Sequence, residues 1–437
     1  MERPPRRRAE PAAAVALRMP SFGGLGRTLS HRNSRVFFGG SLVAWTGLWM
    51  HRIAVSWLAW ELTGSAFWVG MVAFCDLAPA VIISPLAGAV ADRVDRLKLA
   101  MVTQAAIAVQ AAAIAALAAS GHMTIGLLLV LEVLGGIAAS FAQPARQVLM
   151  PGIVPRSELP AAVALNSLIF AVARFVGPAL AGPLIAGFGV VPAIAANAVG
   201  YVVASLSMLL LTIAPSERRG HGSANGLGQE IVEGLRYGWR HAGIWPLLLY
   251  AAMAALLLRS VQELLPPFVD RNFGRGAESL AVLTACFGVG SLIAGLLVAG
   301  RGRLEGTTRL AIWGGLAQAV ATVGFVATGF FPLGMLSAAL IGAFASVHGI
   351  CTQTLLQSAT DPDFRGRMLS LWGLITRAFP AVGALALGAA GEIFGLRVPV
   401  LVAAAAFLVV FVWGLTRLKR MERELEVALP PPAAPRS

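Results

Sequence analysis

The sequence predicts an all-α integral membrane protein built from twelve transmembrane helices. Of its 437 residues, 57% are hydrophobic and only 13% are charged, whereas about 25% of residues are charged in soluble domains. A hydrocarbon core requires about 20 apolar residues per helical span, and twelve such stretches alternate with short polar loops. We expect spans near residues 36–60, 66–90, 99–120, 123–145, 161–187, 191–213, 244–268, 279–300, 309–330, 333–357, 367–391 and 397–416.

The basic residues of the loops predict how these spans are oriented. If the N-terminus is cytoplasmic, 27 of the 34 Lys and Arg residues fall in cytoplasmic segments, and only Arg271, Arg275 and Arg397 face the other side. Lys and Arg stay on the cytoplasmic side because their translocation is costly. Both termini are therefore expected in the cytoplasm. The net charge of +13 then reflects topology, with anionic lipid headgroups as the partner and no nucleic acid.

The spans divide the chain into five expected segments. No apolar stretch directly follows the arginines at 6–8, so we expect no cleaved signal peptide. The Pro-rich end at 430–437 is expected to be disordered. The segments are a cytoplasmic arm over residues 1–34, expected to be disordered, a first six-helix bundle over 35–214, a linker over 215–242, a second six-helix bundle over 243–418 and a cytoplasmic tail over 419–437.

The linker is expected to contain an amphipathic helix over residues 229–239. At helical spacing Ile231, Val232, Leu235 and Trp239 share one face. Such a helix can lie on the inner membrane surface. The alternative interpretation is a regulatory docking site.

The two bundles are expected to be pseudo-symmetric copies of one six-helix plan. Three glycines of the fifth span recur in the eleventh at an offset of 206, and two glutamines of the fourth span recur in the tenth at an offset of 210. A repeat of this kind occurs in secondary transporters, with the site between the halves near mid-membrane. The matching residues are Gly177, Gly182 and Gly189 with Gly383, Gly388 and Gly395, and Gln143 and Gln147 with Gln353 and Gln357.

The chain carries no pattern typical of an enzyme. Cys75, Cys286 and Cys351 each fall within an expected span, so neither a disulfide framework nor a metal-binding spacing is predicted. The sequence contains no phosphate-binding loop of the ATPase kind, no nucleophile triad and no zinc motif. We expect no enzyme activity, no cofactor and no metal.

A family resemblance enters at the loop after the second span. Gly88 is followed four residues later by Asp92-Arg93, and then by Asp95-Arg96. This loop resembles the signature of the major facilitator superfamily, although Asp95 stands where the pattern has Gly and Leu97 interrupts the basic pair. The Asp-Arg-x-Asp-Arg form resembles the branch of enterobactin-exporter-like and macrolide-efflux-like proteins. Stretches at 61–65, 144–147, 177–182 and 365–370 fit the same branch, and the similarity covers about residues 35–415.

The resemblance implies a cytoplasmic gate and an antiporter-like helix. A carboxylate at a helix end can stabilise a neighbouring helix terminus, and arginines can pair with it. The alternative for the gate is ordinary positive-inside charge, and the alternative for the helix motif is small-residue packing. The gate would comprise Gly88, Asp92, Arg93, Arg96, Arg365 and Arg367, and the helix motif Gly177, Pro178 and Gly182.

Ionisable residues within the spans are the candidates for proton coupling, because burying them in a membrane is costly. Burial and a neighbouring arginine act in opposite directions on a carboxyl pKa, and the balance can place proton exchange near neutral pH. We hypothesise that Asp76 or Glu132 exchanges the proton, biased by Arg52 or Arg174. A static ion pair is the alternative. Arg259 and Glu263 are four residues apart, a spacing that allows a local salt bridge, and a functional role for both is the alternative.

A mixture of polar and aromatic side chains is expected to line the central cavity. Such a mixture suits an amphipathic organic molecule better than a small ion or a sugar. The candidate residues are Trp45, Trp49, Asn166, Phe170, Glu263, His348, Gln353 and Arg377.

These observations predict a monomeric transporter of the bacterial inner membrane. We expect it to export an amphipathic small molecule of the drug or siderophore class by proton antiport and alternating access. The first alternative is uptake or facilitated movement of a metabolite by the same fold. The second is a membrane sensor or scaffold, which the lack of a sizeable soluble domain disfavours.

Overall fold

The computed structural model describes residues 22–212, 227–301, 303–361 and 364–426, and within them every regular element is a helix. The first half contains α1 (Phe22–Ser30), α2 (Arg32–Thr63), α3 (Ala66–Arg93), α4 (Arg96–Ala119), α5 (Ile125–Leu149), η1 (Met150–Gly152), η2 (Arg156–Glu158), α6 (Leu159–Phe188) and α7 (Val190–Leu209). After α8 (Leu227–Arg240) come α9 (Ile244–Leu257), η3 (Arg259–Leu264), α10 (Leu265–Phe273), α11 (Ala277–Arg301), α12 (Thr307–Ala327), α13 (Phe331–Ala359), α14 (Arg365–Phe394) and α15 (Arg397–Leu425).

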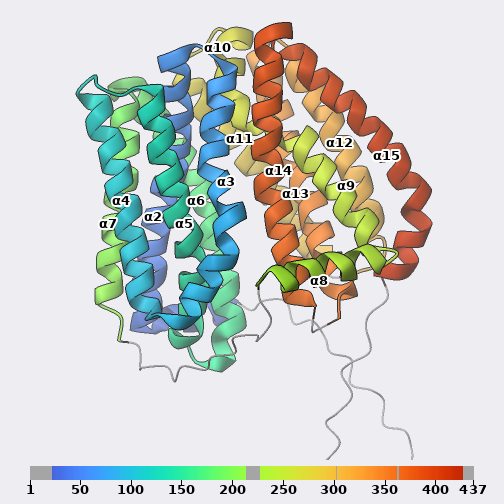
Figure 1. Cartoon of the computed structure of the whole chain (residues 1–437), viewed down its shortest axis with the longest axis horizontal. Helices are drawn as coiled ribbons and strands as arrows, with labels where there is room; N and C mark the ends of the chain where they lie inside the picture. The colour runs from blue at the N-terminus through green and yellow to red at the C-terminus, as the bar shows by residue number, and fades with distance from the viewer. Residues whose placement is uncertain (1–21, 213–226, 302, 362–363, 427–437) are drawn as a thin grey trace, which may run out of the picture.

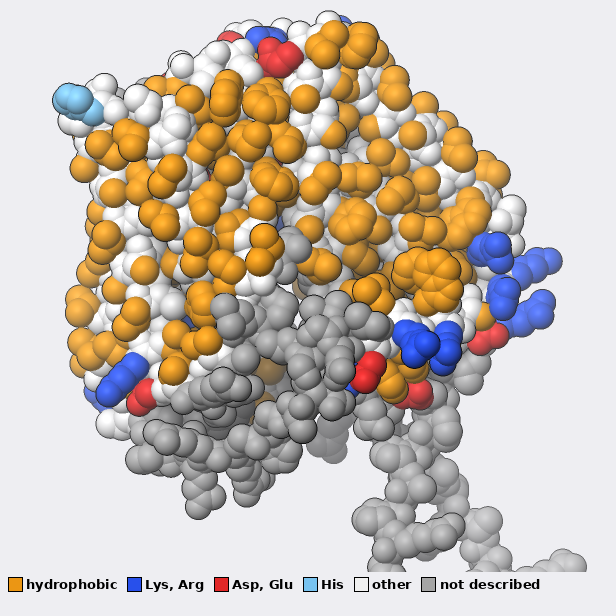
Figure 2. Space-filling model, viewed as in Figure 1, with side chains coloured by type: hydrophobic (Ala, Val, Ile, Leu, Met, Phe, Trp, Pro, Cys, Tyr) orange, Lys and Arg blue, Asp and Glu red, His pale blue; other side chains and the backbone are white. Residues whose placement is uncertain are grey.

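The lengths of these helices confirm a twelve-span membrane bundle. Within the described residues, ten helical stretches are long and apolar enough to cross a membrane, and α9, η3 and α10 together count as one of them. The helices α2 and α3, with 32 and 28 residues, complete the twelve. Figure 2 shows apolar side chains over the middle of the visible face, with charged side chains near its two ends. This distribution matches a hydrocarbon girdle between two polar surfaces.

The helices form two bundles side by side, α2–α7 and α9–α15 (Figure 1). We call the end that carries α1, α8 and the C-terminal end of α15 the terminal face, and the opposite end the far face. In Figure 1 the bundles meet towards the far face and separate towards the terminal face. Each bundle has a buried apolar core, with Phe37 and Phe38 in the first and Tyr250 and Phe407 in the second.

Small residues allow the two bundles to approach closely. On α3 and α14, Gly70 faces the backbone of Ala384 and Gly388 faces the backbone of Ala66. A Cβ atom at Gly388 would lie only 2.5 Å from the Ala66 carbonyl oxygen. Close helix contact in membranes depends on such small side chains. The Gly388 position of the predicted repeat therefore serves the contact between bundles.

The seventh span differs from the continuous helix expected over 244–268. It breaks into α9, the 3₁₀ segment η3 and α10, and α10 begins with Pro266 and Pro267 near its N-terminus. Proline lacks the N–H that a continuing α-helix needs. In a 3₁₀ helix, residues four apart no longer share a face. The local salt bridge between Arg259 and Glu263 that their spacing allows is therefore absent among the described residues.

The linker helix forms as predicted, and it is α8. Its backbone packs on the second bundle, with Gly234 against Arg367 and Gly238 against Met368. Figure 1 shows α8 lying across the terminal face of that bundle. Leu235 and Trp239, from the predicted apolar face, are 41% and 66% exposed. These two side chains therefore point away from the protein, as in a helix that lies on a membrane surface.

The ends of the chain differ from expectation where they are described. Residues 22–30 of the arm expected to be disordered form α1, which packs on α2 and α6. The helix α15 continues to Leu425, beyond the expected end of the span at 416 and into the expected tail. The remainder of the arm, residues 1–21, and the expected disordered end, residues 430–437, lie outside the described residues.

The start of α9 is expected to weaken in acid through His241. Its Nδ1 accepts hydrogen bonds from the backbone N–H groups of Gly243 and Ile244, both at 3.2 Å. Burial lowers the pKa of His241, with Glu424 and Asp361 acting in the opposite direction. Only the neutral ring can accept at Nδ1, so this stabilisation is present above the unfolded pKa of about 6.5. It is lost as the pH falls through the lowered folded pKa.

The expected result is a thermal midpoint that drops by about 1–2 °C more between pH 7.5 and 5.5 in the wild type than in His241→Gln. The measurement is thermal unfolding of detergent-solubilised protein at both pH values. Equal pH dependence of the two proteins would show that His241 does not contribute.

Candidate functional site

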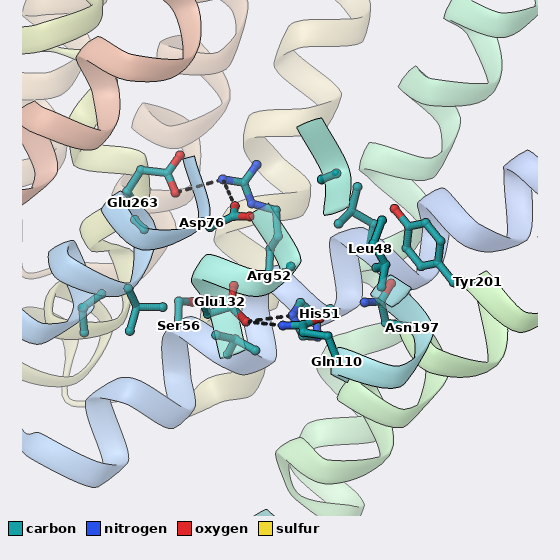
Figure 3. Close-up of a pocket in the computed structure, with 17 residues that line it drawn as sticks. Leu48, His51, Arg52, Ser56, Asp76, Gln110, Glu132, Asn197, Tyr201 and Glu263 are labelled. Atoms are coloured by element: carbon teal, nitrogen blue, oxygen red, sulfur yellow. Dashed lines mark hydrogen bonds and ion pairs between the residues drawn. The ribbon is translucent and has the colours of Figure 1, made fainter. Parts of the chain in front are cut away.

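A polar cavity lies inside the first bundle and reaches the second bundle at Glu263 (Figure 3). Its lining surrounds about 650 Å³ of space, part of which is open to solvent. The helices α2, α3, α4, α5 and α7 supply the other lining residues. The polar or ionisable residues of the lining are His51, Arg52, Ser56, Asp76, Gln110, Glu132, Asn197, Tyr201 and Glu263.

The first charged group of the cavity places one arginine between two carboxylates. Arg52 on α2 lies 3.8 Å from Asp76 on α3 and 3.4 Å from Glu263 on η3. The predicted neighbourhood of Arg52 and Asp76 is present. Glu263, whose spacing allows a pair with Arg259, pairs instead across the two bundles. With both carboxylates ionised this trio carries a net charge of −1, and a single proton neutralises it.

The second charged group lies deeper in the first bundle. His51 and Glu132 are each 5% exposed, with 3.2 Å between His51 Nε2 and Glu132 Oε1. Gln110 on α4 donates to the same carboxylate oxygen at 3.2 Å. Glu132 is therefore held by His51 and Gln110, whereas an arginine partner was expected. The sequence signal for Gln110 is a polar amide in the middle of a span that is apolar except for Thr103 and Gln104.

An aromatic group adjoins the first charged group. The ring of Phe170 on α6 lies 5.3 Å from that of Trp45 and 6.0 Å from that of Trp49, both on α2. The guanidinium groups of Arg52 and Arg174 lie 5.5 and 5.3 Å from the Trp49 ring, within range of cation–π attraction. Phe170 is 40% exposed. We call Trp45, Trp49 and Phe170 the aromatic shelf.

Three further arginines gather where the bundles meet. Arg174 on α6, Arg259 on η3 and Arg377 on α14 interact electrostatically with one another or with Arg52, and each is also attracted by Glu263 or Asp76. Among the described residues, none of these three has a carboxylate within ion-pair distance. Arg259 and Arg377 were expected to be separate elements of the site, and the fold brings them into one basic group.

Three residues predicted to line the central cavity are not among those that the structure brings together. His348 is buried in the second bundle, where its Nδ1 lies 3.0 Å from the Ala311 carbonyl oxygen and its ring 5.5 Å from that of Tyr250. It therefore packs in the bundle core, because its face of α13 turns toward α9 and α12. Gln353 is exposed on α13 and Asn166 is partly buried on α6, each without a described polar partner.

The predicted gate is described only in part. The side chains of Gly88, Asp92, Arg93 and Arg96 lie outside the described residues, although α3 ends at Arg93 and α4 begins at Arg96. Asp95, which departs from the family pattern, accepts hydrogen bonds from the backbone N–H groups of Leu97 and Lys98 at 2.9 and 3.1 Å. It therefore caps α4.

The gate residues of the second bundle contact the linker helix. Arg367 lies 3.0 Å from Glu233 on α8, and Arg365 is exposed at the start of α14. Tyr237 on α8 stacks on Phe364 with 4.3 Å between ring centroids. In this conformation α14 is thus joined to α8 at the terminal face.

The predicted antiporter-like motif lies in the middle of α6. Pro178 is inside the helix, and Gly177 packs against Trp49 of the aromatic shelf. Gly182 lies against Ala281 on α11 of the second bundle. The motif therefore contacts both the shelf and the interface between bundles.

Polar contacts close the far face between the two bundles. Trp60 Nε1 donates to Asp270 at 3.1 Å, and Arg271 donates to the Gly64 carbonyl at 2.7 Å. Glu392 accepts from the backbone N–H of Ala66 at 2.6 Å. In the described part of the chain, no hydrogen bond or ion pair joins the bundles at the terminal face. Among the described residues, the polar contacts that join the two bundles near an end of the molecule therefore lie at the far face.

Comparison with known proteins places the chain among membrane transporters. A family profile described as "Transmembrane secretion effector" matches residues 27–434. The staphyloferrin A transporter of Staphylococcus aureus is 24% identical over 83% of this chain and 90% of its own length. The multidrug efflux pump Tap of Mycolicibacterium fortuitum is 26% identical over 90% and 96%. The enterobactin exporter of Citrobacter koseri is 25% identical over 86% and 85%.

Solved structures share the fold at low sequence identity. A bacterial homologue of the human lysosomal transporter Spinster, in an inward-facing and occupied conformation, superposes with a TM-score of 0.68 at 16% identity. The match covers 90% of this chain and 97% of that structure. The shared architecture confirms the expected two-bundle fold.

Proposed function

Because the chain belongs to the transmembrane secretion effector family of the major facilitator superfamily, we propose that it exports an amphipathic small molecule in exchange for protons. The chain is a multi-pass membrane transporter and not an enzyme. Relatives named for siderophore transport and for drug efflux support a substrate of one of these two classes, and they support the bacterial inner membrane as its location.

The trio of Arg52, Asp76 and Glu263 is the observation that carries this proposal. Its groups come from three helical elements and both bundles. Asp76 and Glu263 share one guanidinium, so either carboxylate can bind a proton while Arg52 remains paired with the other. Ionisable groups within membrane spans are costly and mark ion pathways. The trio is therefore the candidate site of proton exchange, with the His51–Glu132 pair as a second proton acceptor.

The contacts between the bundles support alternating access. The far face is closed by Trp60, Asp270, Gly64, Arg271 and Glu392, while the bundles separate towards the terminal face (Figure 1). The distribution of Lys and Arg supports a cytoplasmic location of the terminal face. The described conformation is then inward-facing, the state in which an exporter loads its substrate.

The Arg52–Glu263 ion pair links proton binding to this conformation. It joins α2 of the first bundle to η3 of the second. A proton on Glu263 removes the charge that holds Arg52, so one contact between the bundles is weakened. Binding of a proton and relative movement of the bundles thus depend on the same pair.

Transport by inverted membrane vesicles tests the proposed function. A deletion strain is first screened for the compound that accumulates in the cell or becomes more toxic. That compound is then offered to inverted vesicles that contain the protein, with and without an imposed proton gradient. We expect accumulation that requires both the protein and the gradient and that stops when nigericin removes the gradient. Equal accumulation without a gradient would refute proton exchange, and accumulation only in right-side-out vesicles would refute export.

A further inference from the structure

The arginines between the two bundles define the charge of the substrate. Resting on the proposed function, we infer that the substrate carries an anionic group, such as a carboxylate, sulfonate or phenolate, on an aromatic or otherwise apolar body. Arg174, Arg259 and Arg377 bind the anionic group, and the aromatic shelf contacts the apolar body.

The balance of charge in this region is the first argument. Four arginines, Arg52, Arg174, Arg259 and Arg377, interact electrostatically around the trio. Two carboxylates, Asp76 and Glu263, lie among them, and both are within ion-pair distance of Arg52. Counting Glu132, which is held by His51 and Gln110 deeper in the first bundle, the arginines still exceed the carboxylates by one.

The position of the unpaired arginines is the second argument. Arg174 and Arg377 lie near the middles of α6 and α14, and Arg259 begins η3 between the two helices of the seventh span. Positive-inside topology places arginine in loops and does not explain arginine at these positions. A cation buried within a membrane span requires a partner; Arg174 and Arg259 are partly buried, whereas Arg377 is exposed. Glu263 and Asp76 attract these three arginines only from beyond ion-pair distance, so an anionic ligand would supply the close partner that the described carboxylates do not.

The aromatic shelf provides the second half of the site. The Arg174 guanidinium lies 5.3 Å from the centre of the Trp49 ring, and Phe170 packs against the same ring and is 40% exposed. A molecule whose apolar part lies on Phe170 therefore has Arg174 within reach of its polar end. Small-molecule sites typically combine an aromatic surface with a small number of well-placed polar groups.

A cationic substrate fits this arrangement poorly. Its charge would have to pair with Asp76 or Glu263, and Arg52 already holds both carboxylates. It would also approach Arg174 and Arg259, where like charges repel. An anion meets neither obstacle.

An anionic substrate is also compatible with exchange for protons. A proton on Glu263 weakens the Arg52–Glu263 pair from its acidic side. An anion bound by Arg174 and Arg259, which both interact electrostatically with Arg52, also attracts Arg52 and weakens the same pair from its basic side. Either ligand can thus release this contact between the bundles, whereas the unloaded protein keeps it. Exchange requires an unloaded carrier that does not change its conformation readily.

Binding of three naphthalene probes of nearly equal shape tests the inference. Purified protein in lipid nanodiscs is titrated by calorimetry with 2-naphthoate, 2-naphthylmethanol and 2-naphthylmethylammonium, which are anionic, neutral and cationic. We expect the anion to bind at least about tenfold more tightly than the cation. We expect Arg174→Gln, Arg259→Gln and Arg377→Gln each to weaken binding of the anion by about tenfold, with little effect on the neutral probe. Arg174→Lys should recover most of the affinity, because it retains the charge.

Arg275→Gln is the matched control, because Arg275 is an exposed arginine that packs on Phe331 at the far face. It should bind 2-naphthoate as the wild type does. Thermal unfolding confirms that each variant is folded, and an uncharged methionine variant replaces any glutamine variant that is not. Equal or tighter binding of the cation, or undiminished binding of the anion by all three glutamine variants, would overturn the inference. The titrations use no proton gradient, so they stand whether or not transport in vesicles depends on protons.

Discussion

Proton-driven export is expected to fall by at least about tenfold in Asp76→Asn, while exchange of substrate across the membrane without a gradient persists. Asparagine has nearly the shape of aspartate but cannot bind and release a proton. The trio would then hold Arg52 with Glu263 alone and carry no net charge, so the variant resembles a permanently protonated site. The measurement compares gradient-driven accumulation with counterflow in the same inverted vesicles.

The controls separate proton exchange from a structural role. Asp76→Glu retains a titratable group and should retain coupling. Glu278→Gln removes an exposed carboxylate at the start of α11 and should behave as the wild type. Glu132→Gln tests the second proton acceptor in the same assay. Wild-type coupling in both Asp76→Asn and Glu132→Gln would eliminate both carboxylates as proton carriers and leave a static ion pair as their role.

Replacing Arg52 and replacing Glu263 by uncharged glutamine are expected to have different effects on stability and on opening of the far face. Arg52→Gln leaves two carboxylates facing each other without a cation. The side chains of Arg52, Asp76 and Glu263 are 29%, 31% and 24% exposed, so solvent reduces the cost to about 1–3 kcal/mol of stability. Glu263→Gln leaves Arg52 paired with Asp76 and should cost less than about 1 kcal/mol. It should instead favour opening of the far face, because it removes a contact between the bundles.

Thermal unfolding and a spin-label distance measure these two effects. With Cys75, Cys286 and Cys351 replaced by alanine, labels at His122 and Val398 report the separation of the bundles, since both residues are exposed at the far face. Glu263→Gln should shift the distance distribution to larger values. If the lost contact contributes about 1 kcal/mol, the ratio of molecules with an open far face to those with a closed one should rise about fivefold. Arg52→Gln should lower the thermal midpoint more than Glu263→Gln does. An unchanged distance distribution in Glu263→Gln would show that the pair does not control opening.

Much of the fold could be predicted from the sequence because the membrane constrains each helix separately. The length and apolar content of each stretch predicted a span, and the described helices bear this out from α2 to α15. The amphipathic pattern at 229–239 predicted α8. The break at η3 was missed, because Pro266 and Pro267 were treated as part of an apolar run and not as a helix start.

The candidate site was predictable in its residue types but not in its pairs. Charges within spans identified Arg52, Asp76 and Glu132, yet the partner of Glu132 is His51, and Glu263 pairs with Arg52, 211 residues away along the chain. His348 is also a polar residue within a span, but its side chain lies in the core of the second bundle. Which face of a helix meets a neighbour depends on rotation and depth, and the composition of a single span specifies neither.

The sequence by itself determined that this protein crosses a membrane repeatedly, with its basic residues concentrated in one set of loops. Each of these properties follows from the free energy of transferring one segment into the membrane or one charge across it. It can therefore be predicted without knowing which helices pack against one another. Only the tertiary structure decided that Arg52 is shared by carboxylates of both bundles, and that Arg174, Arg259 and Arg377 gather without carboxylate partners. Pairing energy depends on distances between helices far apart in the chain, and packing of the two bundles sets those distances.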